Sequence, residues 1–163
     1  MEMATVNEIL QSTIASIMNL RKSINAPVHA LVWGAWGTGK TYVSQQLARK
    51  FENVFYVKIP DGELSKGRLL KLIGFAIGSG ARHTYEATLD LMISFCEYLS
   101  IKPILILDEA QRIMKKNSLM NELKDLSEIS ELSFNYVFLG DKTIPKIISA
   151  HPHSLHKRIL IKK

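Results

Sequence analysis

One run of eight residues constrains this chain more than any other feature. It reads Gly34-Ala35-Trp36-Gly37-Thr38-Gly39-Lys40-Thr41 and fits the pattern G-x-x-x-x-G-K-[ST]. Glycine has no Cβ, so the backbone can wrap closely around phosphate oxygens and point several N–H groups at them. The sequence therefore predicts a loop that binds the phosphates of a nucleoside triphosphate.

The residues on both sides of this loop support the prediction. A short apolar run at 28–33 precedes it, as a buried parallel strand would. After it, Val43, Leu47 and Phe51 recur at helical spacing, with polar residues on the other faces. A helix that begins at about Gly39 would present its positive N-terminal end to the phosphates.

Two side chains of the loop have expected tasks of their own. Lys40 would reach the terminal phosphates as a point charge, and Thr41 would place its hydroxyl on Mg²⁺. The expected nucleotide-binding residues are Gly34, Ala35, Trp36, Gly37, Thr38, Gly39, Lys40, Thr41 and Tyr42.

A second informative stretch lies at 103–109. Four consecutive apolar residues at 104–107 predict a strand buried on both faces, and Asp108 and Glu109 follow directly. Catalytic groups in open α/β sheets lie at the carboxyl ends of strands. Asp108 is therefore expected in the metal site, and Glu109 is expected to polarise the water that attacks the γ-phosphate. The alternative, an acidic helix cap, is weaker because a phosphate loop lies upstream.

The remaining apolar patterns complete an alternating α/β chain. Helices are expected at 4–24, 64–77, 85–99 and 119–129, and strands at 54–59, 134–140 and 159–161. Asp141 follows the fourth strand and either faces the γ-phosphate or caps the next helix. Cys96 lies on an apolar helix face, which predicts a buried small hydrophobe. His151 and His153 are separated by proline, which favours a loop over a zinc site.

Composition bounds the class of protein. With 163 residues, 47% hydrophobic and 22% charged, the chain is expected to form a single globular domain, with a helix at 1–25 and an α/β core at 26–163. No apolar run approaches the roughly 18–20 residues that cross a bilayer, so no membrane partner is expected. A single cysteine and the lack of a secretory signal predict a reducing, cytoplasmic location.

The net charge of +6 is concentrated at one end. From Lys142 to Lys163 there are six basic residues and no acidic ones, while the rest of the chain carries equal numbers of both. This asymmetry suggests a polyanionic partner, and a solubilising tail explains the charge equally well.

Taken in order, these stretches resemble the AAA+ ATPases. The resemblance rests on 34–41, the Asp-Glu-Ala-Gln-Arg run at 108–112, the segment 137–140, and His151-Pro152 leading to Arg158. It is strongest to the branch that contains the phage Mu B transposition protein and related target-selecting ATPases of transposons. The phosphate loop and the acidic strand at 104–109 are specific to the wider ATPase class. The Asp-Glu-Ala-Gln-Arg run and the segment from Gly140 to Arg158 are only moderately specific to this branch.

The resemblance implies a fold, cofactors and partners. The fold would be an α/β three-layer sandwich with a parallel five-stranded sheet in the order 5-1-4-3-2. The cofactors would be ATP and Mg²⁺, and the partners duplex DNA, a transposase and further copies of the chain. Arg158 would reach the γ-phosphate of a neighbouring subunit, although a surface arginine is the alternative. The DNA-binding candidates are Lys66, Arg68, Lys71 and Arg82.

Three departures from the family pattern bear on activity. Trp36 replaces a smaller or polar loop residue, and the polar sensor after the fourth strand falls on Gly140 and Asp141. A carboxylate at Asp141 would repel phosphate, which predicts weak turnover. The sequence ends just after the fifth expected strand, where the family continues into a helical lid. Two other functions therefore stay open: a nucleotide-gated adaptor similar to helicase loaders, and a small-molecule kinase that uses the same phosphate loop.

Overall fold

A computed structural model describes residues 5–34 and 39–162 of the chain. One or two helices lie between successive strands along most of the chain. Their bounds are α1 Val6–Ser23, β1 His29–Trp33, α2 Lys40–Lys50, β2 Val54–Lys58, α3 Lys66–Ile77, α4 Tyr85–Leu99, β3 Ile104–Asp108, α5 Gln111–Met114, α6 Asn117–Glu128, β4 Asn135–Gly140, α7 Ile144–Ala150, the 3-10 turn η1 His156–Arg158 and β5 Ile159–Lys162.

The strands form one sheet in the order β2-β3-β4-β1-β5. Each neighbouring pair is parallel, so the expected parallel sheet and its strand order are confirmed. Because the strands run the same way, their carboxyl ends meet at one edge of the sheet. The phosphate loop leaves β1 at that edge, and Asp108 ends β3 there.

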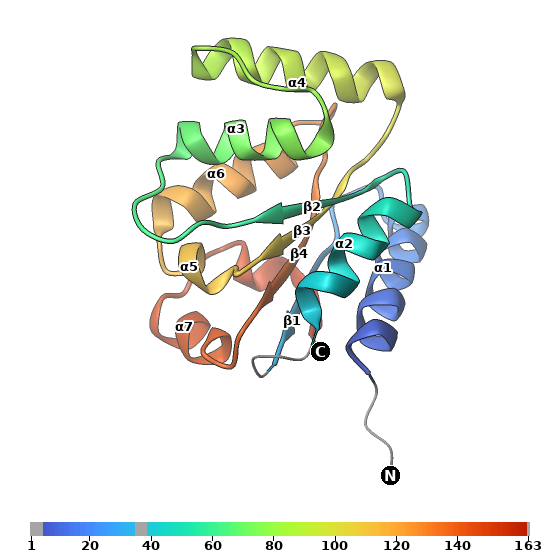
Figure 1. The fold of residues 1–163 in the computed structure, drawn as a ribbon, viewed down its shortest axis with the longest axis vertical. Helices are drawn as coiled ribbons and strands as arrows, with labels where there is room; N and C mark the ends of the chain where they lie inside the picture. Colours follow the sequence, from blue (N-terminus) through green and yellow to red (C-terminus); the bar gives the residue numbers. More distant parts are fainter. Residues whose placement is uncertain (1–4, 35–38, 163) are drawn as a thin grey trace.

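Helices cover both faces of the sheet (Figure 1). On one face, α1 and α2 bury Leu10, Ile14 and Leu47 against Val32 and Leu139. The other face carries the larger core, to which α3, α5 and α6 contribute, while α4 lies outside α3 (Figure 1). This double coverage explains why the middle strand β3 is buried at every position and reads as a continuous apolar run.

Local side-chain chemistry sets where several helices begin. Thr5 and Glu8 form a reciprocal capping box at the start of α1. The hydroxyl of Ser65 accepts the N–H of Arg68 at 3.2 Å, so α3 begins at Lys66, two residues later than the pattern at 64 predicts. Thr84 caps α4 in the same way.

Two details differ from the sequence prediction. The stretch before 119 is more helical than expected, because α5 begins at Gln111 and α6 begins at Asn117. In α4, Met92 and Cys96 are buried as predicted, but Leu99 is 45% exposed, because α4 ends there, before the chain turns toward β3. Within the described residues, no helix is both long enough and apolar enough to cross a membrane.

Candidate functional site

The described part of the phosphate loop is fixed at both of its ends. Gly34 follows β1, and its N–H donates to the carbonyl of Gly140 in β4 at 3.1 Å. Gly39 precedes α2 with φ of +80°, a left-handed conformation in which a Cβ would be strained. The Lys40 ammonium lies 3.4 Å from the carbonyl oxygen of Gly34, so its side chain reaches back toward the end of β1. Ala35, Trp36, Gly37 and Thr38 lie outside the described residues.

Thr41 and Asp108, both expected in the metal site, are in contact although 67 positions separate them in the chain. The Thr41 hydroxyl donates to Asp108 Oδ2 at 2.7 Å, and the Asp108 side chain is almost completely buried. A hydroxyl beside a carboxylate is a pair of hard oxygen donors, which is the donor type that Mg²⁺ prefers. These residues therefore fit the expected metal.

Tyr56 is a member of this site that sequence analysis missed. Its phenol donates to the same Asp108 Oδ2 at 2.5 Å. Burial first, and then the hydrogen bond to Asp108, raise the pKa of the Tyr56 phenol above its ordinary value, so it stays a proton donor. The sequence carried no signal for this contact, which follows from the register of the folded sheet. Lys58 pairs with Asp108, so Tyr56 lies two residues back on the same face.

Glu109 lies next to this cluster and is held by Gln111. Glu109 has φ of +62°, the left-handed conformation, and its N–H donates to Asp108 Oδ1 at 2.9 Å. The side-chain amide of Gln111 donates to Glu109 Oε2, and the Gln111 oxygen accepts the N–H of Asp141 at 3.4 Å. Gln111 therefore bridges the acidic strand β3 and the end of β4.

Asp141 makes contacts at the start of α7. Its Oδ1 accepts the N–H of Thr143 at 2.9 Å and also the Thr143 hydroxyl. The N-cap of α7 is Thr143, so Asp141 binds the cap residue and does not cap the helix itself; a role toward the γ-phosphate stays a prediction. Tyr42, in the first turn of α2, is 67% exposed.

Arg158 lies far from the phosphate loop of its own chain. It precedes β5, and Ile159 pairs with His29 at the start of β1, whereas the loop leaves the other end of β1. The length of β1 separates the two, about 13–17 Å for five residues. The Arg158 guanidinium binds Glu128 at 2.8 Å, and both side chains are about half exposed. A role at its own nucleotide is therefore excluded by distance, and a role at a neighbour's nucleotide stays a prediction.

The four DNA-binding candidates belong to α3 and the loop after it. Lys66, Arg68 and Arg82 are exposed, while Lys71 is partly buried. The Lys66 ammonium lies 5.0 Å from the centre of the Tyr85 ring, a cation–π contact. The loop that leads into α3 is held by Arg112, which binds the carbonyl of Ile59 at 2.7 Å and Asp61 at 3.0 Å. Arg112 therefore joins α5, which follows the acidic strand, to the segment just after β2.

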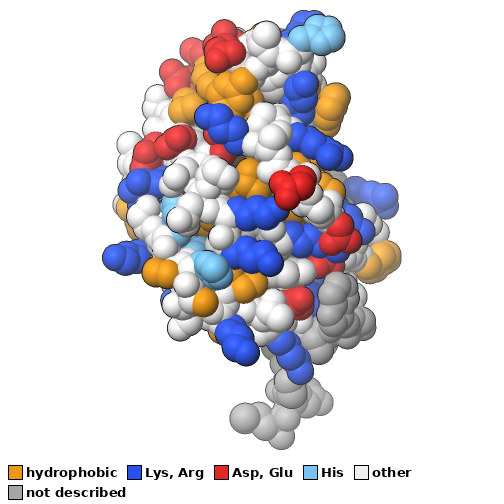
Figure 2. Space-filling view, turned by 90° about the vertical axis from the view of Figure 1, so that its left-hand side faces the viewer, with side chains coloured by type: hydrophobic (Ala, Val, Ile, Leu, Met, Phe, Trp, Pro, Cys, Tyr) orange, Lys and Arg blue, Asp and Glu red, His pale blue; other side chains and the backbone are white. Residues whose placement is uncertain are grey.

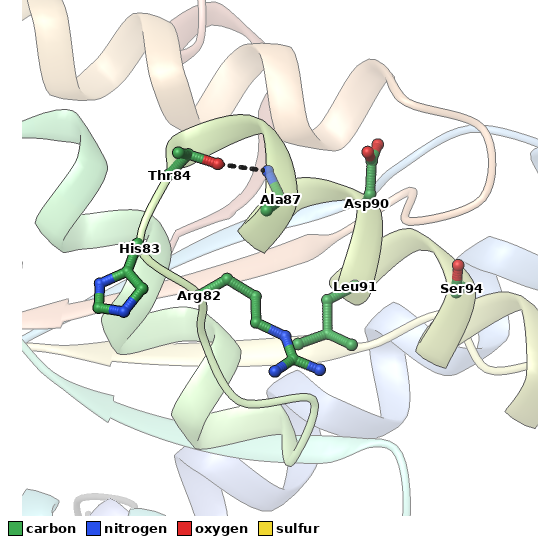
Figure 3. A pocket seen from close by; sticks show the side chains of 7 residues that line it. All are labelled: Arg82, His83, Thr84, Ala87, Asp90, Leu91 and Ser94. Atoms are coloured by element: carbon green, nitrogen blue, oxygen red, sulfur yellow. Dashed lines mark hydrogen bonds between the residues drawn. The ribbon is translucent and has the colours of Figure 1, made fainter.

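Arg82 lines a shallow cavity of about 490 Å³ between its loop and α4. Figure 3 shows its side chain extending beside Leu91, with His83 turned to the other side of the loop. The backbone of Arg82 is fixed, because its N–H and carbonyl both bond to the Thr88 hydroxyl, at 3.0 and 3.2 Å. Figure 2 shows the left-hand face of Figure 1, where Lys and Arg side chains extend from top to bottom.

Two other predictions concern residues outside this site. Cys96 is buried as predicted, and burial raises the pKa of its thiol to about 11, which disfavours a nucleophilic thiolate. His153 bonds to Asn121 at 2.7 Å. Among residues 5–34 and 39–162, there is no group of three or more His, Cys, Asp or Glu side chains that could hold a metal ion.

Comparison with known proteins shows which protein family this chain matches. A family model described as "AAA domain" matches residues 25–159. Comparison with curated proteins gives no match.

Similar solved structures agree in fold. They include Aeropyrum pernix ORC2 in ADPNP-ADP complexes (16% identity, TM-score 0.63, 98% of this chain and 47% of that chain). They also include Pyrobaculum aerophilum Cdc6p (14% identity, TM-score 0.59, 92% and 43%) and Drosophila ORC bound to poly(dA/dT) DNA and Cdc6 (11% identity, TM-score 0.65, 96% and 28%). The chain spans less than half the length of each of these proteins.

Proposed function

The chain belongs to the AAA domain family, and from this premise we propose that it is an ATP-dependent DNA-binding ATPase. Its subunits assemble on duplex DNA when ATP is bound between them. We further propose that the assembly acts in DNA transposition and hands target DNA to a transposase. This last step rests on the ordered sequence motifs at 34–41, 108–112 and 137–158.

The hydrogen bond between Thr41 and Asp108 is the observation that carries the ATPase proposal. It joins the first residues of α2 to the end of β3, so the phosphate loop and the acidic strand form one site. Lys40 and the helix N-terminus bind the phosphates. Thr41 and Asp108 hold Mg²⁺, which when bound neutralises charge that develops on the phosphates. Glu109, one residue further, orients the attacking water.

Arg158 supports assembly through the nucleotide. Its position at the far end of β1 keeps it from its own phosphate loop. A guanidinium that stays charged and forks onto phosphate oxygens suits a neighbour's γ-phosphate. In the isolated subunit it is held by Glu128, half exposed, so it can change partner at low cost.

The basic residues of α3 and its following loop support DNA binding. Lys66, Arg68 and Arg82 are exposed on the α3–α4 side of the molecule, and Arg112 of α5 holds the loop that precedes α3. Contacts of this kind neutralise phosphates, tolerate any sequence and weaken with salt. The residues from Lys142 onward add positive charge to the chain.

Sedimentation with duplex DNA tests the proposal. The full chain is incubated at two salt concentrations with ATP, with a slowly hydrolysed ATP analogue or with ADP. We expect binding only with the triphosphates, weaker at high salt and absent in Lys40→Ala. Absence of DNA binding in every nucleotide state would overturn the DNA and transposition roles. A pull-down with a transposase then tests the last step.

One observation also favours the adaptor function, in which nucleotide binding matters and turnover does not. The amide of Gln111 occupies one oxygen of the Glu109 carboxylate, which leaves Glu109 less free to accept a proton from water. The two functions differ in their response to Glu109→Gln. An adaptor keeps nucleotide-dependent DNA binding and release in this variant, whereas an ATPase keeps binding but loses release. Lys40→Ala abolishes both functions.

A further inference from the structure

The carboxylate of Asp108, which is expected to face a metal, accepts three hydrogen bonds from other groups of the chain. Its Oδ2 accepts two hydroxyls, from Thr41 at 2.7 Å and from Tyr56 at 2.5 Å. Its Oδ1 accepts the N–H of Glu109 at 2.9 Å. A carboxylate has about four positions that accept hydrogen bonds, so the described residues 5–34 and 39–162 fill three of them and leave one, on Oδ1.

Tyr56 is the partner whose presence the phosphate-loop chemistry does not require. Thr41 is part of the loop motif, and the Glu109 N–H belongs to the backbone next to Asp108. Tyr56 instead comes from β2, a neighbouring strand, and reaches Asp108 across the sheet. Removing its hydroxyl alone would leave both of the other contacts in place.

The geometry points to Tyr56 as the positioning residue of the metal site. Together with the Thr41 hydroxyl, the Tyr56 hydroxyl fills both acceptor positions of Oδ2 and so fixes the rotation of the Asp108 carboxylate. The remaining acceptor position on Oδ1 then points in a fixed direction. Groups that orient a metal-binding side chain in this way commonly change metal affinity by about 10–100-fold when they are lost. This inference deepens the proposed function and rests on it, because it concerns the Mg²⁺ that accompanies the nucleotide.

Calorimetric titration of the full chain separates the metal from the nucleotide. The slowly hydrolysed ATP analogue is titrated once with Mg²⁺ and once with EDTA. The dissociation constant in EDTA divided by that in Mg²⁺ gives the gain in affinity that Mg²⁺ provides. For Tyr56→Phe we expect this ratio to fall by about 10-fold or more, while the affinity in EDTA stays within about twofold of wild type. No turnover is needed for the measurement.

Tyr85→Phe is the matched control. It also removes a phenol that donates to a buried carboxylate, Glu122, but it does so on the other side of the sheet. We expect wild-type values for both titrations in this variant. Circular dichroism and urea unfolding establish that both variants fold.

Three other results would overturn the inference in distinguishable ways. If Tyr56→Phe keeps the wild-type ratio, Tyr56 does not position the metal site, and the proposed function is unaffected. If Tyr56→Phe loses affinity equally in Mg²⁺ and in EDTA, its role is structural. If wild type binds the analogue equally with and without Mg²⁺, the metal assignment within the proposed function fails together with the inference.

Discussion

Gly140 leaves room for the side chain of Gln111. A Cβ built at position 140 would lie 2.3 Å from Gln111 Oε1 and 2.5 Å from Ile144 Cδ1. The absence of a side chain at the end of β4 therefore lets an amide from α5 reach between Glu109 and Asp141. The polar group beside Glu109 therefore comes from α5.

Gly140→Ala should displace Gln111 from Glu109. The new Cβ would meet the end of the Gln111 side chain and the buried side chain of Ile144. The variant should fold, with a loss of about 1–3 kcal/mol in the free energy of unfolding. Because Gln111 would then no longer occupy an oxygen of the Glu109 carboxylate, ATP hydrolysis should rise while nucleotide affinity changes little. Gly67→Ala is the control, because its Cβ would meet nothing within 4 Å and alanine favours the helix. If Gly140→Ala and Gly67→Ala have the same free energy of unfolding and the same rate of ATP hydrolysis, the contact between Gln111 and Glu109 does not affect hydrolysis.

Substitutions of Arg158 and Glu128 should affect the rate of ATP hydrolysis differently. Their salt bridge is about half exposed, so breaking it should cost at most about 1 kcal/mol of unfolding free energy. If Arg158 acts on a neighbour's nucleotide, Arg158→Ala should lower DNA-stimulated turnover by on the order of 10³. Glu128→Gln frees the guanidinium and should leave turnover unchanged or raised. Equal losses in both variants, measured by steady-state ATPase assays, would indicate that only the salt bridge matters.

The fold was predictable because its signals are local and repeated. The apolar run before Asp108 indicates a strand that is covered on both faces, and the sheet confirms it. The helix starts were less predictable. The Ser65 side chain, and not the apolar pattern, determines that α3 begins two residues later than expected. The strand order followed from the family resemblance and not from periodicity.

The site was predictable where a motif fixes it and not where partners come from other elements. Asp108 and Thr41 meet as the two motifs indicate. Tyr56 and Gln111 were not predicted, because a tyrosine in a β-rich run and a glutamine in a short helix have no distinctive spacing. Their contacts arise from sheet register and from the space at Gly140, which only the folded chain reveals.

His29 should make stability depend on pH. Its side chain is buried, stacks on Tyr136 and accepts the Tyr136 N–H at 3.1 Å. Burial, and then the charges of Arg158 and Arg21, lower the pKa of His29 from 6.5 to about 4. Between these values the unfolded chain binds more protons, so stability is complete above about pH 6.5 and falls as the pH drops toward 4, by up to about 3 kcal/mol.

Urea unfolding of His29→Asn from pH 4.5 to 7.5 checks this dependence. Asparagine retains an acceptor for the Tyr136 N–H but does not titrate in this range, so the slope of stability against pH should flatten. Part of the slope should remain, since burial also lowers the pKa of His156. His83→Asn, at an exposed position, should keep the wild-type slope. A wild-type slope in His29→Asn would show that other groups produce the dependence.

Arg82 should contribute one phosphate contact to DNA binding. Its backbone is held by Thr88 while its side chain is exposed along the hollow beside α4 (Figure 3), so it can meet a polyanion without first unfolding its loop. Each phosphate that a protein neutralises releases counterions and adds about 0.9 to the slope of log affinity against log salt. Arg82→Gln should therefore reduce this slope by about 1 and weaken binding equally for unrelated duplexes.

Lys102→Gln is the charge-matched control for Arg82. Lys102 precedes β3, and its ammonium donates to the carbonyl of Ser130 at 2.6 Å, outside the α3–α4 segment. Fluorescence anisotropy with a labelled duplex, repeated over a salt series, should give a wild-type slope for Lys102→Gln and a smaller one for Arg82→Gln. Equal slopes in the two variants would mean that net charge, and not the loop before α4, determines DNA binding. The basic C-terminal residues from Lys142 would then be the next to substitute.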